Sequence, residues 1–70
     1  MNIRALMIKL IEHGYTTARL AELLGISKSS VYRKLSGTTE FTRQEIALIR
    51  NAFSLDDDSL VEIFFERTHV

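Results

Sequence analysis

The 70-residue chain has no cysteine, no proline, only three glycines and a formal net charge of zero. Without cysteine there is neither a disulfide framework nor a thiolate metal site, which fits a reducing cytoplasm. The absence of proline is compatible with helices throughout, because proline breaks helix interiors. No run approaches the roughly 20 apolar residues that span a bilayer, and no basic region precedes an apolar block as in a secretory signal. We therefore expect a cytoplasmic protein that does not insert into a membrane.

A sequence of this length makes one domain, so we expect residues 1–70 to form a single unit. Hydrophobic residues make up 46% of the chain, enough for one core. The two histidines, His13 and His69, are far apart in sequence, and there is no Ser-His-Asp set and no glycine-rich phosphate loop. The sequence therefore predicts neither an enzyme nor a metal, cofactor or small-molecule site.

Apolar residues at helical spacing predict five helices and no strand. The first helix follows the cap residue Asn2 and stops at Gly14. Its expected inward stripe consists of Ile3, Leu6, Met7, Leu10 and Ile11.

The last two helices carry clear start signals. Thr42 and Glu45 form a capping box at the start of the fourth helix, and Phe41 precedes it as a hydrophobic staple. Three acidic residues, Asp56 to Asp58, open the fifth helix. Their charges suit the positive end of a helix dipole, and their spacing is not that of a cation-binding loop.

The segment Thr16–Gly37, TTARLAELLGISKSSVYRKLSG, is the most informative part of the chain. It predicts two short helices, at 17–24 and 28–35. Gly25 lies where the first must end, because glycine adopts a left-handed conformation without steric cost. Ser27 is a good N-cap for the second helix, which is polar and basic. Two short helices of this kind, held at a fixed angle, place side chains in the major groove of DNA.

A family pattern runs through this segment. It is carried by Thr16, Thr17, Leu20, Ala21, Gly25, Ile26 and Val31. These residues resemble the helix-turn-helix of phage Cro and repressor proteins, a family often called XRE-like, and the likeness extends from about Ile3 to Phe65. It implies an all-α, compact five-helix lambda-repressor-like DNA-binding domain, with the helix-turn-helix at helices 2 and 3.

Three positions depart from the family pattern. Thr17 stands where the family often has a phosphate-binding Gln, Lys34 where it has a large apolar residue, and Leu35 where it has Glu. Leu35 lies four residues after Val31, so we expect these two to share the inward face of the second motif helix. We expect the Lys34 stem to cover apolar surface while its ammonium group reaches solvent or phosphate.

We expect the outer face of the second motif helix to contact DNA bases. The residues expected there are Ser27, Lys28, Ser29, Tyr32 and Arg33. The resemblance implies that Lys28 and Ser29 read bases and that Arg33 reads a base or grips phosphate. Arginine can take guanine O6 and N7 in bidentate fashion. The alternative is an ordinary solvated helix face, with Ser27 acting as a cap only.

Phosphate contacts are expected around this face. Thr17 begins the first motif helix, and free amides at a helix start bind anions. Plain capping is the preferred role of its neighbour Thr16. The other candidates for backbone contact are Arg19, Arg43, Thr38 and Thr39, the last two together with the Gly37 amide. A merely polar loop after the second motif helix is the alternative for the threonines.

The charges are unevenly distributed along the chain. Residues 1–43 hold seven basic and three acidic side chains, a balance of +4. Residues 44–70 hold two basic and six acidic side chains, a balance of −4. If the two halves occupy opposite sides of the fold, one side is basic and can meet phosphate.

The end of the chain predicts an interface. Ile63, Phe64 and Phe65 cannot all face one core from an α-helix, because successive residues are about 100° apart. At least one is expected outside, and such exposure often marks an interface. A homodimer through these three residues is therefore one expectation, and it suits palindromic DNA with half-sites about one helical turn apart. The alternative is that the small fold covers all three.

The sequence therefore predicts a DNA-binding transcriptional regulator, a Cro-like repressor of phage or prophage type. Its helix at about 28–35 would enter the major groove of double-stranded operator DNA and block polymerase at a promoter. Such a protein is expected in the cytoplasm of a bacterial host, at the nucleoid. The alternative is a protein-interaction module, an antitoxin or antirepressor, which the zero net charge and the apolar end favour.

Overall fold

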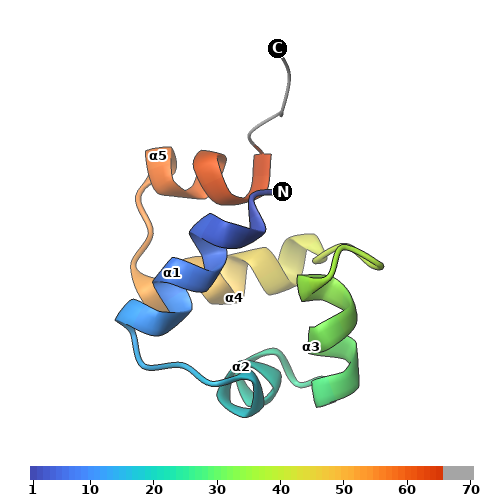
Figure 1. The fold of residues 1–70 in the computed structure, drawn as a ribbon. Helices are drawn as coiled ribbons and strands as arrows, with labels where there is room; N and C mark the ends of the chain where they lie inside the picture. The colour runs from blue at the N-terminus through green and yellow to red at the C-terminus, as the bar shows by residue number, and fades with distance from the viewer. Residues whose placement is uncertain (66–70) are drawn as a thin grey trace.

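The computed structural model describes residues 1–65, which form helices joined by short loops (Figure 1). The helices are α1 (Ile3–Glu12), α2 (Thr17–Leu24), α3 (Lys28–Leu35), α4 (Arg43–Phe53) and α5 (Asp57–Leu60), and α5 continues into a π-helical turn, η1 (Val61–Phe65). Residues 1–65 contain no strand. The all-α prediction with five helices is confirmed, and α2 and α3 have the predicted bounds.

A polar side chain caps the start of every α-helix. The caps are Asn2, Thr16, Ser27, Thr42 and Asp56, and each accepts a hydrogen bond from the amide three residues later at 2.8–3.1 Å. At α4 the Glu45 carboxylate also accepts from the Thr42 amide at 2.9 Å, which completes the predicted capping box. Because such caps act locally, the helix boundaries were readable from the sequence.

One hydrophobic core joins the helices. Its buried members are Leu6, Leu10, Leu20, Ala21, Leu24, Val31, Phe41, Ile49, Phe53, Leu55, Ile63 and Phe64. The side chain expected as a staple, Phe41, is buried and packs edge-on against Phe64 with ring centroids 5.9 Å apart. None of the helices described is long and apolar enough to cross a membrane.

The predicted inward stripe of α1 is wrong at two positions. Leu6 and Leu10 are buried, but Met7 and Ile11 are exposed, Ile11 by 73%. The inward side of α1 is centred on Leu6 and Leu10, with Ala5 and Lys9 half-buried beside them, so it is rotated away from Met7 and Ile11. Apolar periodicity marked both sides of this helix, so it did not identify the buried side.

The apolar end of the chain is largely internal. Ile63 is 1% exposed and Phe64 is buried, whereas Phe65 is 57% exposed. The prediction that at least one of the three lies outside is confirmed. The dimer interface drawn through all three needs correction, since two of them belong to the core. The physical reason is that two successive helical residues can both face the core, as Leu20 and Ala21 do in α2, while the third is turned outside.

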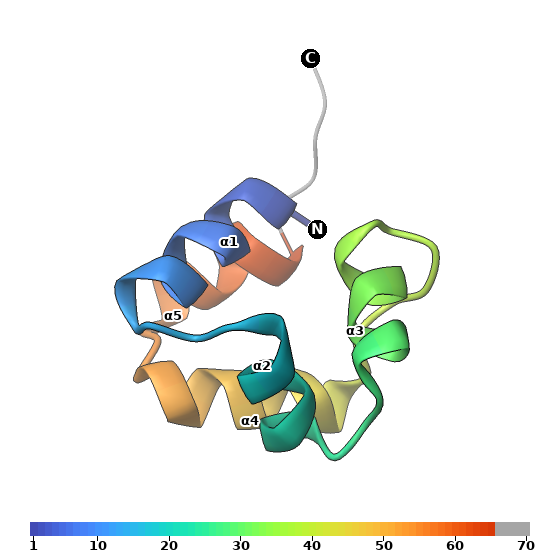
Figure 2. The same cartoon turned by 60° about the horizontal axis from the view of Figure 1, so that its bottom comes forward.

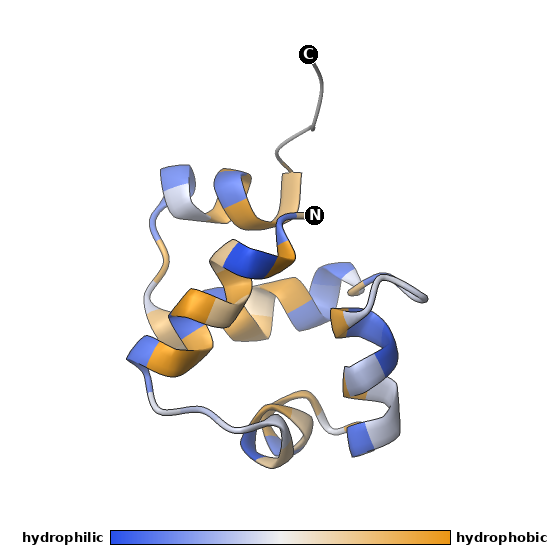
Figure 3. Cartoon of the chain, viewed as in Figure 1, coloured by the Kyte–Doolittle hydropathy of each residue, from blue (hydrophilic) through white to orange (hydrophobic). Residues whose placement is uncertain are grey.

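The basic and acidic helices lie apart. In Figures 1 and 2, α3 lies on one side of the molecule and the start of α5 lies on the other. Figure 3 shows that α3 is mostly hydrophilic along its length, whereas α1 alternates between polar and apolar residues. The acidic start of α5 is therefore remote from the helix predicted to enter DNA.

Candidate nucleic-acid interface

The joint between α2 and α3 is a tight turn. Gly25 adopts a left-handed conformation, with φ 71°, and the Ile26 amide donates to the Ala21 carbonyl at 3.1 Å. Ser27 then caps α3. Ala21 and Val31 are both buried. Their small size allows the two helices to approach closely, which fixes the angle of α3.

The outer face of α3 brings together the residues predicted to read bases. Lys28, Ser29, Tyr32 and Arg33 are all exposed, and Ser29 and Arg33 lie on the side of the helix opposite buried Val31. Tyr32 is 58% exposed, although aromatic rings are usually at least partly covered. The face therefore presents two cations, the Ser29 hydroxyl and the largely exposed ring of Tyr32.

A chain of hydroxyl groups orients Arg33. Its guanidinium Nη2 donates to Ser30 Oγ at 3.2 Å, and Ser27 Oγ donates to the same oxygen at 3.1 Å. The Arg33 side chain is thereby drawn back towards the first turn of α3. Ser30 was not among the predicted site residues. Ser30 lies three residues from both Ser27 and Arg33, and residues three apart are neighbours on a helix. This spacing is the feature of the sequence that could have identified Ser30.

The start of α2 has the form expected of a phosphate site. Thr16 Oγ1 accepts from the Arg19 amide at 3.1 Å, which confirms its role as a cap. Thr17 is the first helical residue and is half-buried. The first amides of a helix have no acceptor within it, and those of Thr17 and Ala18 occupy these positions in α2, so binding of phosphate there stays a prediction.

The loop after α3 differs from the prediction. The Gly37 amide donates to the Lys34 carbonyl at 3.2 Å, and the amides of Thr38 and Thr39 donate to the Arg33 carbonyl at 2.9 and 3.3 Å. The expectation that the Gly37 amide holds phosphate is therefore wrong, because these amides terminate the helix. What Thr38 offers is its hydroxyl, which is 3.0 Å from Ser36 Oγ.

Lys34 also differs from the prediction. Its ammonium does not reach solvent or phosphate: it lies 3.0 Å from Glu45 Oε1, donates to the Glu40 carbonyl at 2.9 Å and lies 5.7 Å from the Phe41 ring centroid. The side chains of Lys34 and Glu45 are each only 11% exposed. Lys34 therefore takes an inward position beside Val31, while Leu35 is half-buried.

The Lys34–Glu45 pair fixes the charge state of the buried carboxyl. Burial alone would raise the pKa of Glu45. The Thr42 amide and the Lys34 ammonium outweigh that effect, and the pKa lies below its ordinary value of 4.5. The end of α3 is thus tied to the start of α4 by an ion pair that stays charged at neutral pH.

The remaining cations differ in how far they are engaged. Arg19 lies 4.0 Å from Glu22 and 4.9 Å from the Tyr15 ring centroid, so its guanidinium already has two partners. Within residues 1–65, Lys28 and Arg43 form no salt bridge with any described residue, and both are exposed. Together with Arg33 they supply the accessible positive charge on and beside α3.

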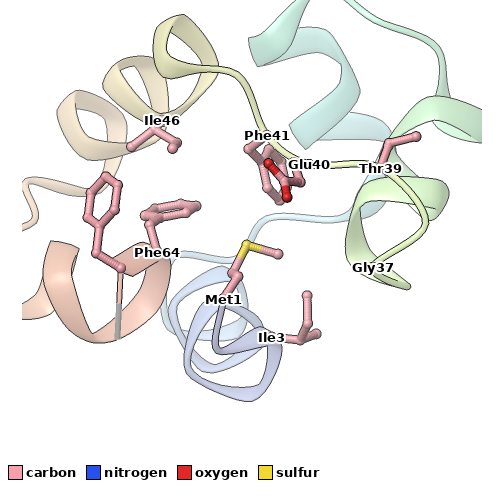
Figure 4. Close-up of a pocket in the computed structure, with 9 residues that line it drawn as sticks. Met1, Ile3, Gly37, Thr39, Glu40, Phe41, Ile46 and Phe64 are labelled. Carbon is pink, nitrogen blue, oxygen red and sulfur yellow. The ribbon is translucent and has the colours of Figure 1, made fainter. Parts of the chain in front are cut away.

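A hollow lies on another part of the surface (Figure 4). Its labelled lining includes Met1, Phe41 and Phe64. Among the lining residues, Glu40 carries a charged side chain and Met1 carries the N-terminal amino group. The rest of the lining is mostly apolar.

The fold and the turn at Gly25 define a helix-turn-helix domain, a class of protein that binds DNA. Residues 2–38, just over half of the chain, match the family model described as the helix-turn-helix domain of resolvase. The chain belongs to this family. The match spans α1, α2 and α3, and so includes every residue predicted to read bases. No curated protein and no solved structure matches the chain.

Proposed function

We propose that this protein is a sequence-specific regulator of transcription, most like a Cro-type repressor of the XRE-like family and of phage or prophage type. It acts as a single domain without catalytic activity, in the bacterial cytoplasm at the nucleoid. It inserts α3 into the major groove of double-stranded operator DNA and occludes a promoter. The observation that carries the proposal is that Lys28, Ser29, Tyr32 and Arg33 are all exposed on α3.

Each residue of this face suits a contact with DNA. Arg33 presents a forked donor for guanine O6 and N7, and Lys28 presents a point charge for the same acceptors. Ser29 lies in the first turn, which faces base edges in this docking geometry. Tyr32 offers its ring to a thymine methyl group or its hydroxyl to phosphate. Thr17, Ser27 and Thr38 would hold phosphates on either side and so set the register.

A homodimer belongs to the proposal. Two domains related by a twofold axis match the two halves of a palindromic site. Of the three residues first expected to form the interface, Phe65 alone offers surface, because Ile63 and Phe64 are buried in the monomer. The main contact between subunits must therefore lie elsewhere or include further residues.

The family match favours a second candidate function. A helix-turn-helix domain of the resolvase family suits a module that directs a resolvase to its DNA site. Both candidates require sequence-specific binding through α3, and they differ in the DNA preferred. The DNA upstream of the gene is the expected target of a regulator, whereas a module of this second kind has no reason to prefer it.

Binding to labelled DNA tests the proposal. Affinity for the DNA upstream of the gene is compared with affinity for random DNA at several salt concentrations. A regulator should prefer the upstream DNA and lose affinity steeply as salt rises, because phosphate contacts release counterions. Arg33→Ala should weaken specific binding by about 1–3 kcal/mol if the side chain reads a base.

Arg50→Ala is the matched control for loss of one positive charge. Arg50 lies on α4 and pairs with Asp57 at 2.9 Å, so its removal should leave specific binding unchanged. Equal effects of the two substitutions would reduce the role of Arg33 to net charge. An absence of any preference, with Arg33→Ala neutral, would sink the proposal and favour an antitoxin or antirepressor that acts on a protein.

A further inference from the structure

Helix α1 carries an apolar stripe that stays exposed in the described part of the chain, residues 1–65. Met7, Ile8 and Ile11 are 40%, 48% and 73% exposed. With Arg4, which is also exposed, they follow the spacing i, i+3, i+4 and i+7, so they share one face of the helix. Large apolar side chains gathered on one face mark an interaction surface more often than scattered ones do.

The charges at the two ends of this stripe are placed against the helix dipole. Arg4 lies in the first turn of α1, where acidic groups are favoured, and no acidic residue stands there. Glu12 is the last residue of the helix, where basic groups are favoured. Its side chain remains 56% exposed although Lys9 lies 3.5 Å away. Neither placement helps an isolated helix.

We infer that the partner of this stripe is α1 of a second copy of the chain, packed antiparallel across a twofold axis. An axis midway between Met7 and Ile8 places Met7 of each copy against Ile8 of the other. With a rise of 1.5 Å per residue, Arg4 and Glu12 lie about 5 and about 7 Å from this axis on opposite sides. Arg4 of one copy then lies beside Glu12 and the negative end of α1 in the other, and both charges are favourably placed.

This inference rests on the proposed function in one respect: a palindromic DNA site is what requires paired subunits. The stripe itself is separate from the exposed face of α3, since the two helices stand apart in both views (Figures 1 and 2). One helix face per subunit is a small interface, typical of weak and transient association. Dimerisation in the micromolar range is therefore expected, and DNA with two half-sites should strengthen it.

Sedimentation of the DNA-free protein over a range of concentrations tests the inference. The wild-type protein should pass from monomer to dimer. Ile11→Gln should raise the dissociation constant of the dimer at least tenfold. Arg4→Glu and Glu12→Arg should each weaken it, because each sets like charges opposite one another across the axis. The double variant R4E/E12R should recover dimerisation, because the opposite charges meet again.

Two controls keep the test decisive. The charge swaps also suit the dipole of α1, so circular dichroism should show that each variant folds. Tyr32→Gln removes an exposed apolar side chain from α3 and should leave dimerisation unchanged while weakening DNA binding. A wild-type protein that stays monomeric at millimolar concentration overturns the inference, as does a failure of the double variant to recover. Specific DNA binding by such a monomer would keep the proposed DNA-binding role of α3 and remove only the homodimer from the proposed function. A dimer without specific DNA binding would support the inference and contradict the proposed function.

Discussion

The ion pair between Lys34 and Glu45 should stabilise the fold measurably, although both side chains are largely buried. At 3.0 Å and an effective dielectric constant of about 20, Coulomb's law gives about 5 kcal/mol of attraction. Desolvation of two largely buried charged groups offsets much of this. A coupling free energy of about 2 kcal/mol should remain between the two side chains.

A double-mutant cycle measures this coupling. Lys34→Met leaves the Glu45 carboxylate buried without its cation and the Glu40 carbonyl without its donor, so it should cost about 3 kcal/mol. Glu45→Gln keeps an acceptor for the Thr42 amide, and should cost about 2 kcal/mol. The double variant should cost about 3 kcal/mol, less than the two single costs added together. Urea unfolding at pH 7 gives all four free energies of unfolding.

An exposed pair of similar length provides the control. Arg50 and Asp57 are 2.9 Å apart, with side chains 46% and 86% exposed. The cycle with Arg50→Gln and Asp57→Asn should give a coupling below about 1 kcal/mol, because water screens the pair. Two results would refute this reasoning. One is that the losses in free energy of unfolding for Lys34→Met and Glu45→Gln sum to the loss of the double variant within about 0.5 kcal/mol. The other is that the exposed pair couples as strongly as the buried pair.

Two further outcomes follow from the same groups and from α3. The lowered pKa of Glu45 stabilises the fold above its ordinary value of 4.5, and this contribution is lost as the pH falls through the folded-state pKa. Urea midpoints should therefore fall in acid, and Glu45→Gln should flatten the loss. In Ser30→Ala the backbone amide at this position can still donate to the Oγ of the cap residue Ser27. The substitution removes the side-chain oxygen that accepts from Arg33. Its stability should stay within about 0.5 kcal/mol of wild type, whereas specific DNA binding should weaken several-fold, less than for Arg33→Ala.

The parts of the fold that the sequence predicted are those with local causes. The bounds of α2 and α3 depend on Thr16, Gly25 and Ser27, each of which acts on amides or carbonyls within four residues. The exposure of Tyr32 and Arg33 follows from their spacing from Val31 within one helix. Such relations are visible in a single sequence because they need no knowledge of other helices.

The predictions that failed depended on partners distant in sequence. Lys34 meets Glu45 from the next helix, and a charge pattern along the chain does not show which charges will be buried together. Ile11 is apolar and correctly spaced, yet the described fold provides no element to cover it. Phe64 turns inward through a π turn and packs on Phe41, more than twenty residues earlier. Each outcome is set by tertiary packing.

Burial of Lys34 has a consequence for how tightly one domain can hold DNA. Of the three cations on α3, only Lys28 and Arg33 remain accessible, and the chain as a whole carries no net charge. Since nonspecific affinity grows with the number of phosphates neutralised, a single copy should bind weakly and depend on contacts with bases. Two copies on one duplex double both kinds of contact and make the second binding event intramolecular. A neutral protein with a short cationic helix is thus better suited to reading paired half-sites than to holding DNA alone, and this raises the importance of whichever surface joins the copies.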